Sequence, residues 1–153
     1  MSLDSLIKKA LAKQELKPSR TKKRNAQPES VEQEKVIKWA RDNEKNYPFL
    51  WMLHSSLNGV KLSKIQAGKA KASGMLSGVP DLFLPVPRGS FFGLYIEMKS
   101  ATGRIMPNQS RYLKAVSDFG YTAFVCYSAD EAIEKIKSYY FGLNLQHHFG
   151  ILA

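Results

Sequence analysis

The chain has 153 residues, of which 44% are hydrophobic and 24% are charged, and its formal net charge is +10. This length suits one domain with a substantial core, and its single cysteine, Cys126, excludes an internal disulfide and a cysteine-rich zinc site. No apolar stretch approaches the roughly 18 residues of a membrane span, and the N-terminus has no secretory signal. We therefore expect an intracellular protein with no membrane partner.

The positive charge is unevenly distributed and favours a polyanionic partner. Residues 1–28 carry eight basic and two acidic side chains, and we predict a short helix followed by a flexible basic arm. This arm either neutralises nucleic-acid phosphates or serves only as a solubilising tail. Between Lys45 and Ser117, ten basic residues accompany only two acidic ones, Asp81 and Glu97. Metal-dependent chemistry on a phosphate backbone would need such an isolated pair of carboxylates.

The first helix is predicted to begin near Ser30, which has the spacing of a capping box with Gln33. Its buried face is marked by three residues, Val36, Trp39 and Ala40. Glu32 shares this inward side, where its carboxylate either compensates the helix dipole or reaches a functional site. After Pro48, the apolar run from Phe49 to His54 predicts a buried first strand.

The segment from Lys61 to Gly78 contains no acidic residue and many small ones. We predict a helix with one lysine-rich face, followed by a glycine-flanked loop. Solvation alone would explain these lysines, but their position just before Asp81 favours contact with phosphates. The lysines of this segment are Lys61, Lys64, Lys69 and Lys71.

Two further strands are predicted at Leu82–Leu84 and around Ile96, joined by a Pro- and Gly-rich hairpin connection that includes Arg88. Side chains of a strand repeat every two residues, so Glu97 and Lys99 share one face. An antiparallel neighbour would then bring Asp81 beside Glu97. Two carboxylates and an ammonium group would meet at one end of a small sheet.

This group of charges suits metal-assisted hydrolysis. Carboxylate oxygens are the hard ligands that Mg²⁺ requires, and Mg²⁺ is usually held by one or two carboxylates together with water and substrate phosphate. A lysine beside the metal can orient or help to deprotonate the attacking water. The alternative is an exposed strand with an ordinary cross-strand Glu–Lys pair.

A second helix is predicted to begin at Pro107 and to end near Gly120. Gln109 points inward in its first turn, because apolar residues follow it at positions i+3 and i+4. Arg104 and Arg111 lie near the start of this helix and are candidates for contact with phosphates.

A fourth strand is predicted at Tyr121–Tyr127, and a third helix follows, capped by Ser128 with Glu131. The predicted order is therefore helix, strand, strand, strand, helix, strand, helix. Residues 142–153 form an apolar C-terminal tail.

At this point the sequence resembles the VRR-NUC family of the PD-(D/E)XK nuclease superfamily. The resemblance spans about residues 30–140, and its first part matches the family's first helix through Val31-Glu32-Gln33 and Trp39-Ala40. The other residues that carry it are Gly78-Val79-Pro80-Asp81-Leu82, Gly93-Leu94-Tyr95-Ile96-Glu97-Met98-Lys99, Gln109 and Gly120-Tyr121. An isolated Asp followed by Glu-x-Lys is a weak signal, whereas the full set in this order is specific. Met106 stands where the family commonly has a serine, which puts little in doubt.

The resemblance implies a fold and a domain division. The fold would be α/β of the restriction-endonuclease-like type, with an αβββαβ core and a small mixed sheet flanked by helices. The nuclease domain would occupy residues 29–141, between the basic arm at 1–28 and the tail at 142–153.

The resemblance also implies a metal site. Asp81, Glu97 and the main-chain carbonyl of Met98 would bind Mg²⁺ or Mn²⁺, and Glu32 would act on the metal directly or through water. Lys99 would position or activate the attacking water. The implied catalytic residues are Glu32, Asp81, Glu97, Lys99 and Gln109, the last near the lysine and the scissile phosphate.

We therefore expect an endonuclease that uses Mg²⁺ or Mn²⁺, and no small-molecule cofactor, to hydrolyse phosphodiester bonds in DNA. Short phage or bacterial members of the family resemble Holliday-junction resolvases and tend to be dimers. This likeness implies a homodimer in the cytoplasm of a bacterial or phage-infected cell, selective for branched or flap DNA. The expected DNA-binding residues are Lys61, Lys64, Lys69, Lys71, Arg88, Arg104 and Arg111.

Two alternatives compete with this function. A non-catalytic nucleic-acid-binding protein on a nuclease fold would have lost one of Asp81, Glu97 and Lys99, and all three are present. A restriction-type, sequence-specific endonuclease would need additional loops to read bases, and a core of about 110 residues leaves little room for them.

Overall fold

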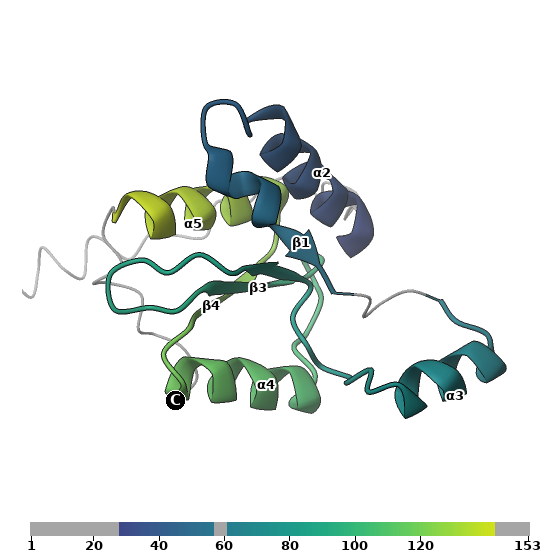
Figure 1. Cartoon of the computed structure of the whole chain (residues 1–153). Helices are drawn as coiled ribbons and strands as arrows, with labels where there is room; N and C mark the ends of the chain where they lie inside the picture. The colour runs from purple at the N-terminus through teal and green to yellow at the C-terminus, as the bar shows by residue number, and fades with distance from the viewer. Residues whose placement is uncertain (1–27, 57–60, 143–153) are drawn as a thin grey trace, which may run out of the picture.

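The computed structural model describes residues 28–56 and 61–142, in which helices flank both faces of a four-stranded sheet (Figure 1). The elements are α2 (Glu29–Asp42), the 3₁₀ helix η1 (Pro48–Met52), β1 (His54–Ser55), α3 (Lys64–Ala72), β2 (Leu82–Leu84), β3 (Leu94–Met98), α4 (Pro107–Asp118), β4 (Thr122–Cys126) and α5 (Ala129–Phe141). This order confirms the expected α/β fold and its αβββαβ core. The predicted arm and tail lie outside the described residues, except for Pro28 and Gly142.

The sheet has the strand order β1-β2-β3-β4 and is mixed. β1 pairs with β2 and β2 with β3 in antiparallel fashion, whereas β3 and β4 are parallel and are joined by the crossover helix α4. In the β2–β3 hairpin, Leu82 lies opposite Ile96 and Phe83 lies opposite Tyr95. Asp81 immediately precedes β2, so this register brings it level with the end of β3 that carries Glu97.

One face of the sheet packs on α2 and α5 and forms the main core. Leu94, Ile96 and Met98 of β3 point to this face and are buried, in keeping with their alternation along the strand. Val36 of α2 and Ile136 of α5 belong to the same buried cluster. In Figure 1, α2 and α5 cover the upper face of the hairpin, and α4 covers its lower face.

The face on the α4 side carries the alternate residues of the same strands. Phe83 and Tyr95 stack there with ring centroids 4.3 Å apart, and the Tyr112 ring of α4 packs edge-on against Tyr95 at 6.0 Å. Glu97 follows Tyr95 by two residues and therefore lies on this face, at the end of the strand. The candidate site thus stands beside an aromatic row on a rigid hairpin.

Two local predictions are wrong. The run from Phe49 to His54 is not a strand: Pro48–Met52 forms a 3₁₀ helix, and only His54 and Ser55 pair with β2. Leu50 and Leu53 are buried, whereas the side chain of Trp51 is 65% exposed. Two buried positions three residues apart match a helical turn rather than the two-residue repeat of a strand.

The first helix also begins earlier than expected. α2 starts at Glu29 with Pro28 as its N-cap, and no side chain caps it, so the predicted capping box of Ser30 and Gln33 is wrong. Pro28 has the extended conformation of a cap, and its carbonyl accepts the amide hydrogen of Val31. Ser30 therefore lies inside the first turn. The predictions for the later helices are confirmed, because Pro107 opens α4 and the Ser128 hydroxyl accepts the amide hydrogen of Glu131.

Helix α3 is present as predicted but stands apart from the sheet (Figure 1). It has no buried residue, and a capping box of Ser63 and Gln66 begins it. The chain returns to the body at Gly78, where φ is +88°. A Cβ at Gly78 would lie 2.7 Å from the backbone of Asn108, so this close approach to the start of α4 requires glycine.

Two further observations concern the single cysteine and the apolar character of the helices. Cys126 is buried in the core, and burial raises the pKa of its thiol to about 12. In the described part of the chain, none of the helices combines the length and the apolar character that a bilayer span requires.

Candidate active site

The structure brings Asp81, Glu97 and Lys99 together at the end of the β2–β3 hairpin. The Asp81 carboxylate oxygen Oδ2 accepts the Met98 amide hydrogen, with 2.8 Å between oxygen and nitrogen. Lys99 Nζ lies 2.7 Å from Glu97 Oε1 on the same face of the strand. The convergence that the sequence spacing predicts is therefore present in the structure.

The Glu97 carboxylate is fully buried, and only one of its two oxygens has hydrogen-bond partners among the described residues. Its Oε1 atom receives the Lys99 ammonium and a short hydrogen bond from the Gln109 amide nitrogen Nε2. Gln109 is fixed in turn, because its Oε1 atom accepts the amide hydrogen of Met106 at 2.9 Å. Glu97 Oε2 is buried and has no hydrogen-bond partner among the described residues. A buried carboxylate oxygen without a donor is costly unless a cation satisfies it.

A third carboxylate reaches the site from the first turn of α2. Glu29 Oε2 lies 3.6 Å from Lys99 Nζ, and Glu29 Oε1 accepts the amide hydrogen of Ser100 at 3.0 Å. Lys99 is only 6% exposed and is thus enclosed between Glu97 and Glu29. Glu29 is not among the site residues that the sequence predicts.

Glu32, the expected helix-one acid, lies elsewhere. Its Oε2 atom accepts the Ala129 amide hydrogen at 2.7 Å, at the start of α5, and its Oε1 atom pairs with Lys35. Glu29 and Glu32 are three residues apart and lie on a similar side of the helix, so periodicity alone does not separate them. The N-terminus of α5 packs against α2, and its Ala129 amide binds the Glu32 carboxylate. The acid of α2 that contacts Lys99 is therefore Glu29.

The pKa values of the site residues are shifted by burial and by the proximity of several carboxylates. Burial raises the pKa of Asp81, and the Met98 amide and Lys99 only partly offset it. Burial also raises the pKa of Glu97 to about 7, with repulsion from Asp81 and Glu29 opposing the attraction of Lys99. Burial would lower the pKa of Lys99, but Glu97 and the other two carboxylates raise it, which keeps the ammonium charged. Three carboxylates and one ammonium leave a formal charge of −2.

A divalent cation fits this donor set. Asp81 and Glu97 offer hard carboxylate oxygens, and the Met98 amide points toward Asp81. The N–H and C=O of one residue in a strand point the same way, so the Met98 carbonyl lies on this edge as well. Within residues 28–56 and 61–142, no group of three or more His, Cys, Asp or Glu side chains is arranged to hold a metal. The fit therefore rests on two carboxylates and a main-chain oxygen, which suits Mg²⁺ because it retains several waters.

The expected DNA-binding residues separate into two groups. Those on and around α3, together with Arg104 and Arg111 at the start of α4, are all exposed. Arg88 differs, because its guanidinium stacks 3.6 Å from the ring centroid of Tyr140 and it is half-buried. It lies in the turn between β2 and β3, at the opposite end of the hairpin from Glu97. The structure gives Arg88 a packing contact away from Glu97, and its expected DNA contact stays a prediction.

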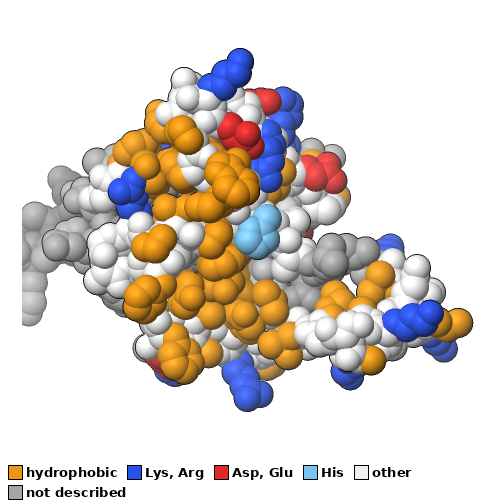
Figure 2. Space-filling view, in the orientation of Figure 1, with side chains coloured by type: hydrophobic (Ala, Val, Ile, Leu, Met, Phe, Trp, Pro, Cys, Tyr) orange, Lys and Arg blue, Asp and Glu red, His pale blue; other side chains and the backbone are white. Residues whose placement is uncertain are grey.

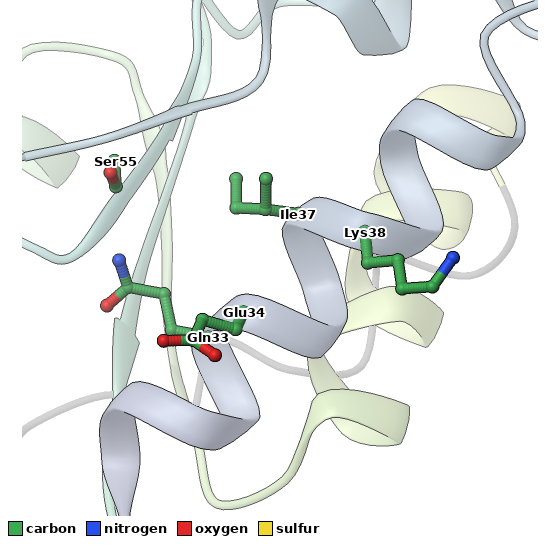
Figure 3. A pocket seen from close by; sticks show the side chains of 5 residues that line it. All are labelled: Gln33, Glu34, Ile37, Lys38 and Ser55. Carbon is green, nitrogen blue, oxygen red and sulfur yellow. The ribbon is translucent and has the colours of Figure 1, made fainter.

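A separate pocket lies between α2 and the edge strand β1 (Figure 3). Its lining residues are Gln33, Glu34, Ile37, Lys38 and Ser55. They include a single carboxylate and none of the residues that hold Glu97. This pocket therefore lacks the paired carboxylates that distinguish the candidate active site.

Comparisons with known proteins identify the family and the fold of the chain. A family model described as the VRR-NUC domain matches residues 13–130 of the chain. A similar solved structure, titled "VRR_NUC domain protein", is 28% identical, with a TM-score of 0.64 over 76% of this chain and 90% of that chain. No curated protein matches the chain.

The raised carboxyl pKa values predict how stability depends on pH. Because the folded-state pKa of Glu97 is raised, its contribution to stability is complete below its ordinary value and is lost as the pH rises through about 7. In metal-free buffer, wild type should therefore lose more unfolding free energy than Glu97→Gln between about pH 5 and about pH 8. Urea titrations at each pH measure this difference. Equal losses of unfolding free energy in the two proteins would contradict the raised pKa of Glu97 in the folded state.

Proposed function

The chain belongs to the VRR-NUC family, which has a nuclease-type fold, and from this premise we propose that it is a DNA endonuclease dependent on Mg²⁺ or Mn²⁺. The observation that carries the proposal is the buried Glu97 carboxylate. One of its oxygens is held by Lys99 and Gln109, and the other has no donor among the described residues. Asp81 stands beside it, so two carboxylates share the site with one ammonium.

Each side chain has a role that follows from its contacts. Asp81, Glu97 and the Met98 carbonyl would hold the metal, which when bound supplies positive charge to the phosphate and lowers the pKa of water. The Lys99 ammonium, kept charged by its neighbours, would orient the attacking water and stabilise the negative charge that develops on the phosphate. Gln109 would keep Glu97 in one orientation through its hydrogen bond.

Glu29 replaces Glu32 in this proposal as the acid from the first helix. It touches Lys99 rather than the other two carboxylates, so we assign it as a positioning residue. Its charge helps to keep Lys99 protonated, and its hydrogen bond to Ser100 fixes the backbone immediately after the lysine.

The finer parts of the proposal rest on the resemblance to the family. We propose branched or flap DNA as the substrate and a homodimer as the acting form, in the cytoplasm of a bacterial or phage-infected cell. Each site can cut one strand, so a two-fold dimer would provide two coordinated cuts. The proposal needs no small-molecule cofactor.

Cleavage of a labelled DNA panel tests the proposed function. The panel comprises linear duplex, flap, splayed arm and four-way junction, each with Mg²⁺, Mn²⁺ or EDTA. We expect wild type to cut only with metal, and Lys99→Ala to be slower by a factor on the order of 100 or more, because charge stabilisation at the phosphate is lost.

The panel also identifies the alternatives. Binding to every substrate without cutting in either metal would leave a non-catalytic DNA-binding protein. Cutting confined to one sequence would indicate a restriction-type enzyme. Equal cleavage of linear and branched DNA would contradict the proposed structure selectivity.

Substituting each acid of α2 tests the assignment of Glu29. Glu29→Gln keeps an acceptor for Ser100 but removes the charge beside Lys99, and we expect the cleavage rate to fall by about 10- to 100-fold. Glu32→Gln is the matched control and should leave the rate within about threefold, because Glu32 contacts Ala129 and Lys35. Melting temperatures and pH–rate profiles of both variants separate a positioning role from a loss of folding. A slow Glu32→Gln beside an unaffected Glu29→Gln would refute the assignment.

A further inference from the structure

Helix α3 and its flanks, residues 61–78, form a basic projection that we call the α3 arm. The arm carries Lys61, Lys64, Lys69 and Lys71 and no acidic residue. No side chain of α3 is buried, and the helix stands away from the sheet (Figure 1). Figure 2 shows several basic side chains over this part of the surface, interspersed with hydrophobic ones. Such an element is exposed to a partner on most of its sides.

The lysines of the arm differ in their ion pairing from four lysines on the surfaces of the other helices. Four lysines of α2, α4 and α5 each have a carboxylate within 3.1 Å, namely Lys35, Lys38, Lys114 and Lys137. By contrast, no lysine of the arm forms an ion pair with any described residue. The charge of the four arm lysines is therefore not compensated by an ion pair within the described protein, whereas that of these four helical lysines is.

The arm gains little stability from packing. α3 has nine residues, and isolated helices shorter than about 12 residues are marginal in water. Its interior includes Gly68, where the space for a side chain is open and nothing lies within 4 Å of an added Cβ. A polyanion bound along the lysines would reduce their mutual repulsion and supply contacts that the protein itself does not.

The arm is also connected closely to the active site. Gly78 ends the arm against the backbone of Asn108, and Asp81 follows three residues later. Asn108 immediately precedes Gln109, which holds Glu97. The arm therefore projects from the chain segment that leads directly into the candidate active site.

We propose that the α3 arm grips the phosphate backbone of the DNA segment that flanks the scissile phosphate. The inference rests on the proposed nuclease function and adds a requirement: DNA must extend past the cut on the side of the arm. The arm also exposes Ile65, which is 74% accessible. A second copy is the less suitable occupant, because each copy has a net charge of +10 and the arm offers only positive charge.

The salt dependence of DNA binding tests whether the arm lysines contact the phosphate backbone. The arm variant changes the four arm lysines to Gln, and the control variant changes Lys35, Lys38, Lys114 and Lys137 to Gln. Both variants lose four positive charges in the full chain. Binding to a linear duplex is measured in EDTA from about 50 to about 200 mM salt, where each lost phosphate contact should reduce the slope of log K against log salt by about 0.9. We expect a reduction of up to about 3.6 for the arm variant and a much smaller change for the control.

Two further measurements predict changes in DNA binding and in cleavage that misfolding of a variant would not produce. Gly68→Ala favours the helix and should tighten DNA binding by up to about fivefold, since alanine is preferred over glycine by about 1 kcal/mol. With metal, shortening the duplex on one side of the cut should slow cleavage by wild type and leave the rate of the arm variant unchanged.

The outcomes separate the arm from the active site. Wild type that binds and cuts while the arm and control variants show equal salt slopes would overturn the arm proposal and leave the proposed function intact. Wild type that neither binds nor cuts any DNA would overturn both. Light scattering distinguishes a protein interface: a wild-type dimer that becomes monomeric in Ile65→Asp, with an unchanged salt slope in the arm variant, would also overturn the proposal.

Discussion

Burial of the Glu97 carboxylate is the constraint on which the rest of the site depends. A buried carboxylate needs donors or a cation, and here Lys99 and Gln109 approach only Oε1. Burial raises the pKa of Glu97 to about 7, and the nearby negative charges of Asp81 and Glu29 add to this rise. A single ammonium does not balance three carboxylates. A divalent cation bound to Glu97 and Asp81 would neutralise this excess, and it is also what hydrolysis of a phosphodiester requires.

The fold meets this constraint by attaching each group to a rigid element. The β2–β3 register sets Asp81 beside the end of β3, and α4 begins with Gln109 in its first turn. The main core holds the hairpin from its other face, and the Glu97 side chain is fully buried at the end of β3. Helix α2 supplies Glu29 at its first residue. Among the described elements, the α3 arm alone lies outside this framework, which suits an element that contacts the substrate instead of the core.

The sequence predicts those parts of the site that depend on short-range geometry. The two-residue repeat of β3 places Glu97 and Lys99 on one face, and the hairpin adds Asp81; Pro107 likewise fixes the start of α4 and hence Gln109. The choice between Glu29 and Glu32 depends on where α5 meets α2, and a contact between residues 97 positions apart leaves no local pattern. The same holds for Arg88, whose position is decided by packing on Tyr140, and for η1, whose apolar residues are compatible with both strand and turn.

The central claim is that Asp81 and Glu97 form a cation site, and a calorimetric titration of Mn²⁺ without DNA tests it most directly. Wild type should bind the ion, and binding should weaken below about pH 7 because protons compete for Glu97. Asp81→Asn and Glu97→Gln should each bind about tenfold or more weakly, whereas Glu34→Gln, in the separate pocket of α2, should match wild type. Equal affinity in wild type and Glu97→Gln would contradict the account.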